Sequence, residues 1–421
     1  MVEIGRLLEM VARGVPSLIL RPWDFPFFWL LVGLVALQYR RVAENERRLY
    51  GVAKNQALRH VLVAMGYGLI GGVVASLLMA FLGVSLSGTG VVWLLPLALL
   101  LMAVSPRLMC FSYAGGLVSA SYLLFGWPKV HVPALMALVA VLHVTESVLI
   151  FLRGSSCATP VTVRDAVGGG VRSGFLLQGF WPLPLLMLFV VILPPGAARE
   201  GLMEMPSWWP LVAPPAELAA QPGAVFTLFP VAAVLGYSDL AARFSPRTKA
   251  RRSAALLLGY SFILLALAVI SSTRPEFVWL AALWGPLGHE LVVKQGTAGE
   301  FRERGALAPA PDGVTVLDVL PGGGAQAAGV QSGDVLLEVD GQPTVDPSSV
   351  ASAMGWGNRK VTLAIRRDGI RRDLIVELRA MEPDGPPVLG IIPLPPDGVA
   401  PQLEVHNRGF LQLYLRRLLR R

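Results

Sequence analysis

The stretch LPGGGAQAAGVQSGDVLLEVDGQPTVD, residues 320–346, has the residue order of a small α+β domain. It follows directly on VTVLDV, in which apolar and polar residues partly alternate as they do in a β-strand. Glycine, proline and small polar residues then separate the apolar runs, as they do at turns. In chain order the sequence predicts a strand at 314–320, a turn at 321–324, a short helix at 325–330, a turn at 332–334 and a strand at 335–341.

The residues after this stretch complete the domain. Asp346 is a typical helix-capping residue and Pro347 suits the first helical position, so a helix is expected to run to about Met354. Residues 360–380 alternate on both sides of Asp368-Gly369, a dipeptide typical of tight hairpin turns. The sequence therefore predicts a helix and then a β-hairpin after the first two strands.

This order of elements resembles a bacterial PDZ domain. That family has a strand, a PxSPAxxAG segment, a GDxIxxVNG segment, a helix and two closing strands, and the spacing here matches without a gap. The departures are Gly323-Gly324 where Ser-Pro is usual, and Asp340 where Asn is usual. The resemblance implies a partly open β-barrel with two helices that binds peptide segments or C-termini of other proteins.

In this family an extended peptide adds to a strand edge beside a helix, and its carboxylate binds N–H groups of an apolar-Gly-apolar loop. We favour Leu389-Gly390-Ile391-Ile392 as this loop, although it follows the domain and implies a permuted order.

The alternative loop, Gly305-Ala306-Leu307, is in the usual place, but Pro309 and Pro311 would shorten its binding strand. Val350 and Met354 are candidates for the helix side of the groove. Packing inside the domain core is an equally good interpretation of both side chains.

Residues 25–293 have the composition of membrane-spanning segments. The chain of 421 residues is 54% hydrophobic and only 15% charged, whereas soluble domains carry about 25% charged residues. Many apolar runs approach the length of about 20 residues that a helix needs to cross a bilayer. We therefore expect a multi-span α-helical membrane bundle followed by a small α+β PDZ domain.

About seven to nine spans are predicted, because several runs are short for a spanning helix. They lie near residues 25–39, 61–84, 91–104, 108–126, 130–152, 174–194, 224–242, 253–271 and 277–293. The predicted domains are a membrane domain at 1–293, a linker at 294–303, the PDZ domain at 304–393, and a Pro-rich linker with a basic tail at 394–421.

Two amphipathic segments lie outside these spans. Residues 6–20 are expected to form a helix along the membrane surface. The tail RGFLQLYLRRLLRR, 408–421, has leucines beside arginines, which suits a helix on an anionic leaflet. A disordered or partner-binding tail is the alternative for that segment.

Basic residues are concentrated in alternate loops. The loops at 40–60, 105–107, 153–173 and 243–252 contain Arg or Lys, whereas those at 85–90, 127–129, 195–223 and 272–276 have few. The positive-inside rule therefore places the C-terminal domain of this multi-pass protein in the cytoplasm. Arg6, Arg13 and Arg21 disagree, because this pattern places the N-terminal end outside. The resemblance to bacterial PDZ domains implies that the membrane is a bacterial plasma membrane. The net charge of +8 forms no single stripe, so the bilayer is an expected partner and nucleic acid is not.

Ionisable residues inside the spans are candidates for function, because burying them in hydrocarbon is unfavourable. His143 and Glu146 lie on one face of a span, Asp239 lies near the end of another, and His289 and Glu290 lie in GHELVVK near the end of the last. The simplest interpretation is that these groups pair across helices and specify packing.

The His289-Glu290 pair resembles part of the zinc motif of site-2-type intramembrane proteases, which also carry PDZ domains. That motif is HExxH, and the second His is missing here. Pro383-Asp384-Gly385 is similar to the family's later Asp motif, but it follows the globular domain. The two cysteines, Cys110 and Cys157, have no His at zinc-motif spacing.

We therefore expect no catalytic residues, no metal ligands, no cofactor and no enzymatic activity. The alternative is a site-2-like intramembrane metalloprotease, or an inactive relative, whose PDZ domain presents the substrate. A metal site built from His143, Glu146 and His289 would belong to that alternative.

The whole chain is similar to the MinJ-like membrane proteins of Gram-positive bacteria. The similar segments are FFWLLVGLVALQYRRVAENERR (27–48), LHVTESVLIFLRG (142–154), GFLLQGFWPLPLLM (174–187), GPLGHELVV (285–293) and VLGII (388–392). That family links the polar scaffold DivIVA to the MinCD division inhibitor. The resemblance thus implies a scaffold that recruits division-site or polar proteins and helps to place the septum.

Overall fold

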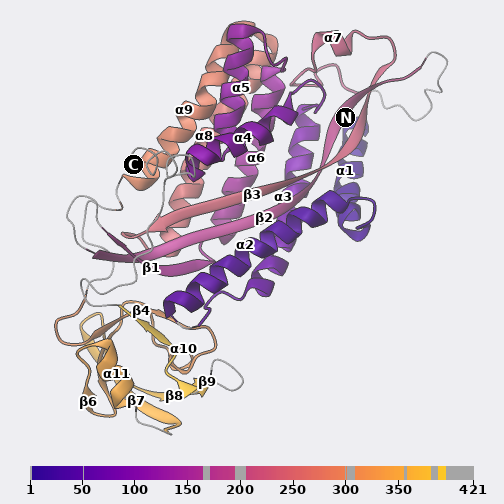
Figure 1. The fold of residues 1–421 in the computed structure, drawn as a ribbon. Helices are drawn as coiled ribbons and strands as arrows, with labels where there is room; N and C mark the ends of the chain where they lie inside the picture. The colour runs from indigo at the N-terminus through magenta and orange to yellow at the C-terminus, as the bar shows by residue number, and fades with distance from the viewer. Residues whose placement is uncertain are drawn as a thin grey trace, which may run out of the picture.

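The computed structural model describes residues 2–50, 52–164, 171–194, 205–298, 300, 309–354, 358–380 and 387–394. It has an N-terminal helical domain with its own three-stranded sheet, followed by a smaller C-terminal β domain (Figure 1). The division into a helical part and a small α+β part is as the sequence predicts.

The helical domain contains α1 (Val2–Leu20), α2 (Pro26–Tyr50), α3 (Ala57–Leu82), α4 (Leu94–Val104), α5 (Phe111–Phe125), α6 (Val132–Arg153), α7 (Ala216–Ala219), α8 (Pro246–Thr273) and α9 (Val278–Thr297). Among the described residues, the three helices α3, α6 and α8 are long and apolar enough to cross a membrane, by length and composition. Helix α6 is buried along most of its length and packs against α3, α5, α8 and α9. Helix α9 continues through residues 294–297, which the sequence assigns to a linker.

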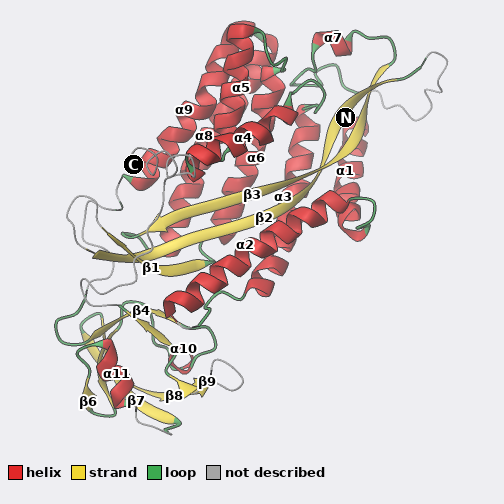
Figure 2. Ribbon diagram, in the orientation of Figure 1, coloured by secondary structure: helices red, strands yellow, loops and turns green. Residues whose placement is uncertain are grey.

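Two of the predicted helical spans are strands. Residues 174–194 fall in β2 (Val171–Ile192) and residues 224–242 in β3 (Ala224–Ala241), which form a long antiparallel hairpin. The short strand β1 (Ala158–Arg164) pairs with the start of β2, so the sheet order is β1-β2-β3 (Figure 2). The helical prediction is wrong here because an apolar run alone does not distinguish a buried strand from a buried helix.

Two prolines were the available signal for a strand. Pro182 and Pro184 lie in the middle of β2, and two prolines so close together would break the interior of a helix. In the sheet both prolines lie beyond Leu177, where the pairing of β2 with β1 ends. That edge of β2 has no partner strand there among the described residues, so proline can lack its N–H without losing a hydrogen bond to a neighbouring strand.

Helix α3 covers the open edge of β2. A Cβ on Gly68 would lie 2.1 Å from the carbonyl oxygen of Pro182, and a Cβ on Gly72 would lie 2.2 Å from that of Pro184. Only glycine permits so close an approach of helix backbone to strand backbone. The two glycines therefore shield the strand edge, which otherwise presents unpaired polar groups.

Side chains satisfy the N–H groups along the same edge. The Ser76 hydroxyl accepts a hydrogen bond from Leu186 N–H at 2.9 Å, and the Tyr39 hydroxyl accepts one from Phe180 N–H at 3.0 Å. Residues 68, 72 and 76 face residues 182, 184 and 186 in turn. Four helical residues rise about 6 Å and two strand residues advance about 6.6 Å, so the two elements stay in register.

Helix α1 is amphipathic, as the pattern at 6–20 predicts. Its apolar stripe, which includes Leu7, Val11 and Val15, is buried against α3 and β2. Leu186 and Leu188 of β2 belong to the same cluster. The stripe is therefore covered by protein rather than left for the membrane surface.

The C-terminal domain contains β4 (Val314–Val319), α10 (Gly324–Ala327), β5 (Val335–Val339), β6 (Gln342–Pro343), α11 (Pro347–Ala353), β7 (Lys360–Arg367), β8 (Ile370–Glu377), β9 (Arg379–Ala380), β10 (Pro387–Val388) and β11 (Ile391–Pro393). The strands of its main sheet run in the order β11-β4-β5-β7-β8, and every pair is antiparallel. The strands, short helix, capped helix and hairpin predicted from the sequence are all present.

Local chemistry explains several of these element boundaries. The carboxylate of Asp346 accepts a hydrogen bond from Ser349 N–H at 2.7 Å, and the Ser349 hydroxyl accepts one from Asp346 N–H at 3.1 Å. This reciprocal pair is a capping box, and it begins α11. Asp368 and Gly369 have φ values of 52° and 80°, the left-handed conformation that a two-residue hairpin turn requires.

The C-terminal domain packs on the helical domain through the outer face of β4 and β11. Apolar residues of this face belong to the same buried cluster as the core of the helical domain: Leu317, Leu320, Ile392 and Leu394. Lys54, in the loop between α2 and α3, forms an ion pair with Asp318. The same ammonium donates a hydrogen bond to the Ala158 carbonyl oxygen at 3.1 Å. The α2–α3 loop therefore holds β1 and the C-terminal domain together.

Candidate functional site

The loop before β11 has the backbone geometry of an anion-binding nest. The carbonyl oxygens of Leu389 and Gly390 accept hydrogen bonds from Ala325 N–H at 2.9 Å and from Leu320 N–H at 2.8 Å. In a trans peptide the N–H points opposite to the C=O, so the N–H groups of Gly390 and Ile391 point away from these contacts. Gly390 adopts φ +79°, and successive N–H groups around such a residue form a concave site for a carboxylate.

Strand β11 provides the adjacent edge. It pairs with β4 on one side, and no strand of the described part of the chain pairs with its other side. The carbonyl oxygen of Gly390 accepts its hydrogen bond from the N–H of Leu320, directly after β4. Successive residues of an antiparallel strand direct their N–H and C=O groups to opposite sides, so those of Ile391 point toward the open side. An extended peptide has a backbone partner there, directly beside the nest.

The proposed groove residues have different surroundings. Leu389 and Ile392 are buried, whereas Ile391 is half-buried. Val350 is 5% exposed inside the PDZ core, which supports the packing interpretation, and Met354 is half-buried against the same core. The alternative loop at 305–307 lies outside the described residues.

Part of the C-terminal domain matches a known protein family. Residues 315–367, from β4 to the end of β7, match the family of PDZ domains. The chain therefore contains a PDZ domain at these residues. No curated protein matches the chain.

Among solved structures, the domain is similar to two from Listeria. The PDZ domain of the SdrC-like protein of Listeria monocytogenes is 21% identical; the likeness covers 20% of this chain and 90% of that chain, with a TM-score of 0.19. The PDZ domain of the SdrC-like protein of Listeria innocua is 26% identical, with 20% and 93% covered and a TM-score of 0.18.

Asp239 belongs to a buried ion cluster at the end of β3. Its carboxylate lies 3.3 Å from the ammonium of Lys249, which is 2% exposed and also lies 3.3 Å from Glu300. The Ser253 hydroxyl donates to Asp239 at 2.6 Å, and the carboxylate of Glu300 accepts from the Arg243 N–H at 2.9 Å. This cluster joins β3, α8 and the segment after α9, so Asp239 pairs from a strand and not from a helix as expected.

Glu290 is held at the side of its helix by two partners. The Tyr113 hydroxyl donates to its carboxylate at 2.8 Å, and the Arg107 guanidinium lies 3.3 Å away. Both partners are near the start of α5. Glu290 is therefore paired across helices rather than directed at the neighbouring His289 side chain.

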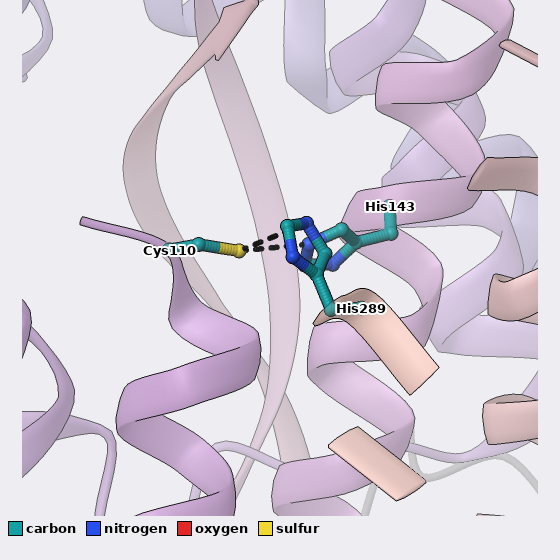
Figure 3. A group of neighbouring side chains, drawn as sticks. All are labelled: Cys110, His143 and His289. Carbon is teal, nitrogen blue, oxygen red and sulfur yellow. Dashed lines mark hydrogen bonds between the residues drawn. The ribbon is translucent and has the colours of Figure 1, made fainter. Parts of the chain in front are cut away.

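His143 and His289 both contact Cys110, for which the sequence predicts no role. The Cys110 sulfur lies 3.2 Å from Nε2 of His143 and 3.6 Å from Nε2 of His289 (Figure 3). Cys110 caps the N-terminus of α5, His143 lies in α6 and His289 in α9. Glu146, one turn after His143, interacts electrostatically with all three residues.

The contacts within the cysteine–histidine cluster and within the ion cluster could not be predicted from the sequence, and the reason is the same for both. Cys110, His143 and His289 are separated by 33 and more residues, and so are Lys249 and Glu300. Neither cluster has a spacing motif. The only sequence signal was that Asp239, His143 and His289 are ionisable residues within apolar stretches.

Proposed function

We propose that the protein is a non-enzymatic membrane scaffold that recruits other proteins through its PDZ domain. The observation that carries this proposal is the nest at Leu389-Gly390 beside the open edge of β11. A peptide's C-terminal carboxylate would bind the nest, and its backbone would extend the sheet. The apolar helices α3, α6 and α8 would hold this binding surface at the bilayer.

The resemblance to the MinJ-like family supports a more specific proposal. In that version the recruited partners are division-site or polar scaffold proteins, and the PDZ domain faces the cytoplasm of a bacterial cell. The basic loops at 40–60 and 243–252 support this orientation by the positive-inside rule.

A single backbone change tests the groove in the full-length protein. Ile391→Pro removes an N–H that faces the open edge while leaving the Gly390 bond to Leu320 in place. The matched control is Ile375→Ala on β8, at the opposite edge of the sheet, where the side chain is exposed.

The assay is co-purification from detergent-solubilised native membranes. We expect partner proteins to be recovered with the wild type and with the control, and to be lost with Ile391→Pro and with a chain that ends at Glu303. Recovery of the same partners by the chain ending at Glu303 would assign recruitment to the helical domain. If no division-site protein is recovered with the wild type, the more specific proposal fails.

The cluster of Cys110, His143 and His289 favours one second candidate, a metal-dependent intramembrane protease or its inactive relative. A carboxylate near a metal-bound water is the usual general base of such hydrolases, and Glu146 is near the cluster. Against activity, Val293 occupies the place of the second His of HExxH. Cleavage of a membrane-protein substrate by the wild type and not by Glu146→Gln would establish an active protease, and lack of cleavage by the wild type would leave only the inactive relative.

A further inference from the structure

We infer that Cys110, His143 and His289 form a zinc-binding site between α5, α6 and α9. Their ligand atoms all lie within 4.8 Å of one another. The inference concerns a different part of the molecule from the PDZ groove, so it stands whether or not the scaffold proposal is correct.

The distances fit a metal site. With Zn–S of about 2.3 Å and Zn–N of about 2.0–2.1 Å, a tetrahedral zinc ion holds a sulfur and a nitrogen ligand about 3.6 Å apart. The sulfur of Cys110 lies 3.2 Å and 3.6 Å from the Nε2 atoms of His143 and His289. Both imidazoles point at the sulfur from neighbouring helices, as Figure 3 shows. Small side-chain shifts suffice to place a zinc ion among the three atoms.

The hydrogen bonds of His143 leave its Nε2 free to act as a ligand. Its Nδ1 lies 2.7 Å from the Val139 carbonyl oxygen, which only accepts, so Nδ1 carries the proton. Metal-binding histidines commonly donate their second N–H to a carbonyl in this way, which fixes the tautomer.

Ser112 lies beside Nε2 of His143 but donates its hydroxyl proton to another group. The Ser112 oxygen is 3.2 Å from Nε2 of His143 and 2.6 Å from the Tyr260 hydroxyl. Tyr260 donates to the Gly285 carbonyl at 3.0 Å, so its oxygen accepts the proton of Ser112. Nε2 therefore retains an electron pair directed toward the cluster.

His289 is oriented by packing. Its ring makes edge contacts with those of Tyr113, His143 and Tyr260, at centroid separations of 5.2, 5.5 and 5.7 Å. Its buried Nδ1 has no hydrogen-bond partner among the described residues. The only polar atom that Nε2 of this ring faces in the described structure is the Cys110 sulfur.

Zinc accounts for the arrangement better than hydrogen bonds alone. Without a metal, the Cys110 thiol would donate to Nε2 of His143 and its sulfur would accept from Nε2–H of His289, and sulfur is only a weak donor and a weak acceptor. A zinc ion accepts electron pairs from the thiolate and both imidazoles at once. The donor set of one thiolate and two imidazoles suits zinc, and carboxylate-preferring magnesium and calcium do not fit it.

Three protein ligands leave one zinc position for water. Cys110 and His289 are partly exposed, whereas His143 is buried. An open fourth position is typical of reactive rather than purely structural zinc sites.

The first experiment measures bound metal directly. The full-length protein is purified in detergent with an affinity tag that contains no histidine, and its metals are quantified by mass spectrometry. We expect one zinc per chain in the wild type, and none in Cys110→Ala, His143→Asn or His289→Asn. Cys157→Ala and His131→Asn change the same residue types outside the cluster and should keep the zinc. Absence of zinc after loading and desalting, or equal zinc in all variants, would overturn the inference, as would copper in place of zinc.

A second measurement leaves all three proposed zinc ligands, Cys110, His143 and His289, unchanged. The chain has two cysteines, so Cys157→Ala leaves Cys110 as the only thiol. Zinc should slow alkylation of Cys110 in the folded protein, a chelator should restore the rate, and added zinc should slow it again. An alkylation rate that is the same in all three conditions would show that the cluster is held by hydrogen bonds alone.

Discussion

Replacing Gly72 by alanine tests the contact between α3 and the open edge of β2. The new Cβ would lie 2.2 Å from the carbonyl oxygen of Pro184. Carbon and oxygen atoms normally approach no closer than about 3.3 Å, so α3 would have to move away by about 1.1 Å. Such overpacking typically destabilises a protein by about 1–3 kcal/mol. Gly68→Ala should act in the same way, since its Cβ would lie 2.1 Å from the Pro182 oxygen.

Gly66→Ala is the matched control, because no atom lies within 4 Å of its added Cβ. Both Gly66→Ala and Gly72→Ala gain the helix propensity of alanine, about 1 kcal/mol. The difference between them therefore isolates the steric effect. The assay is thermal or denaturant unfolding in detergent, followed by tryptophan fluorescence. Gly72→Ala should unfold well before Gly66→Ala. Equal stability of the two variants would refute the close contact of α3 with a strand, and would restore a helical interpretation of residues 174–194.

Three further predictions concern buried or capping groups. Lys249→Met should destabilise the protein by about 3–5 kcal/mol, because it leaves Asp239 and Glu300 buried without their cation; unfolding in detergent measures this. Burial raises the pKa of Cys157 from 9.0 to about 12, so a thiol reagent should not modify it between pH 7 and 9 unless the chain is unfolded. The unfolded thiol ionises near pH 9 and the folded one does not, so its contribution to stability should fall as the pH rises from 9 toward 12. Asp346→Ala should destabilise the PDZ domain by about 1 kcal/mol through loss of the helix cap, as measured by hydrogen exchange of α11.

The predictions for Lys249 and Asp346 each have a control variant in the same element or domain. Arg251→Met removes a cation from α8 that is exposed, and it should have little effect on unfolding. Modification of Cys157 in the folded chain at pH 8 would contradict its burial. Asp373→Ala, at an exposed position of β8, should leave the exchange of α11 unchanged.

The PDZ domain could be predicted from the sequence because its determinants are local. The Asp346 cap, the Asp368-Gly369 turn and the alternating strands depend on neighbours within a few residues, and the structure reproduces them. The family resemblance and the letters LGII implied that residues 389–392 form the binding loop in a permuted order, whereas the pairing of β11 with β4 became apparent only in the structure. The hydrogen bonds that form the nest became apparent only in the folded domain.

The helical domain separates what the sequence by itself determined from what required tertiary structure. Apolar composition and length determined which segments would be buried, and most of the predicted spans are helices. Whether residues 174–194 become helix or strand depends on partners distant in sequence, since β3 and the Gly68-Gly72 face of α3 satisfy the edges of β2. The contact of Cys110 with His143 and His289 likewise depends on how α5, α6 and α9 pack. Local pattern specifies burial and turns, whereas pairing between distant segments is decided by the packing of the whole chain.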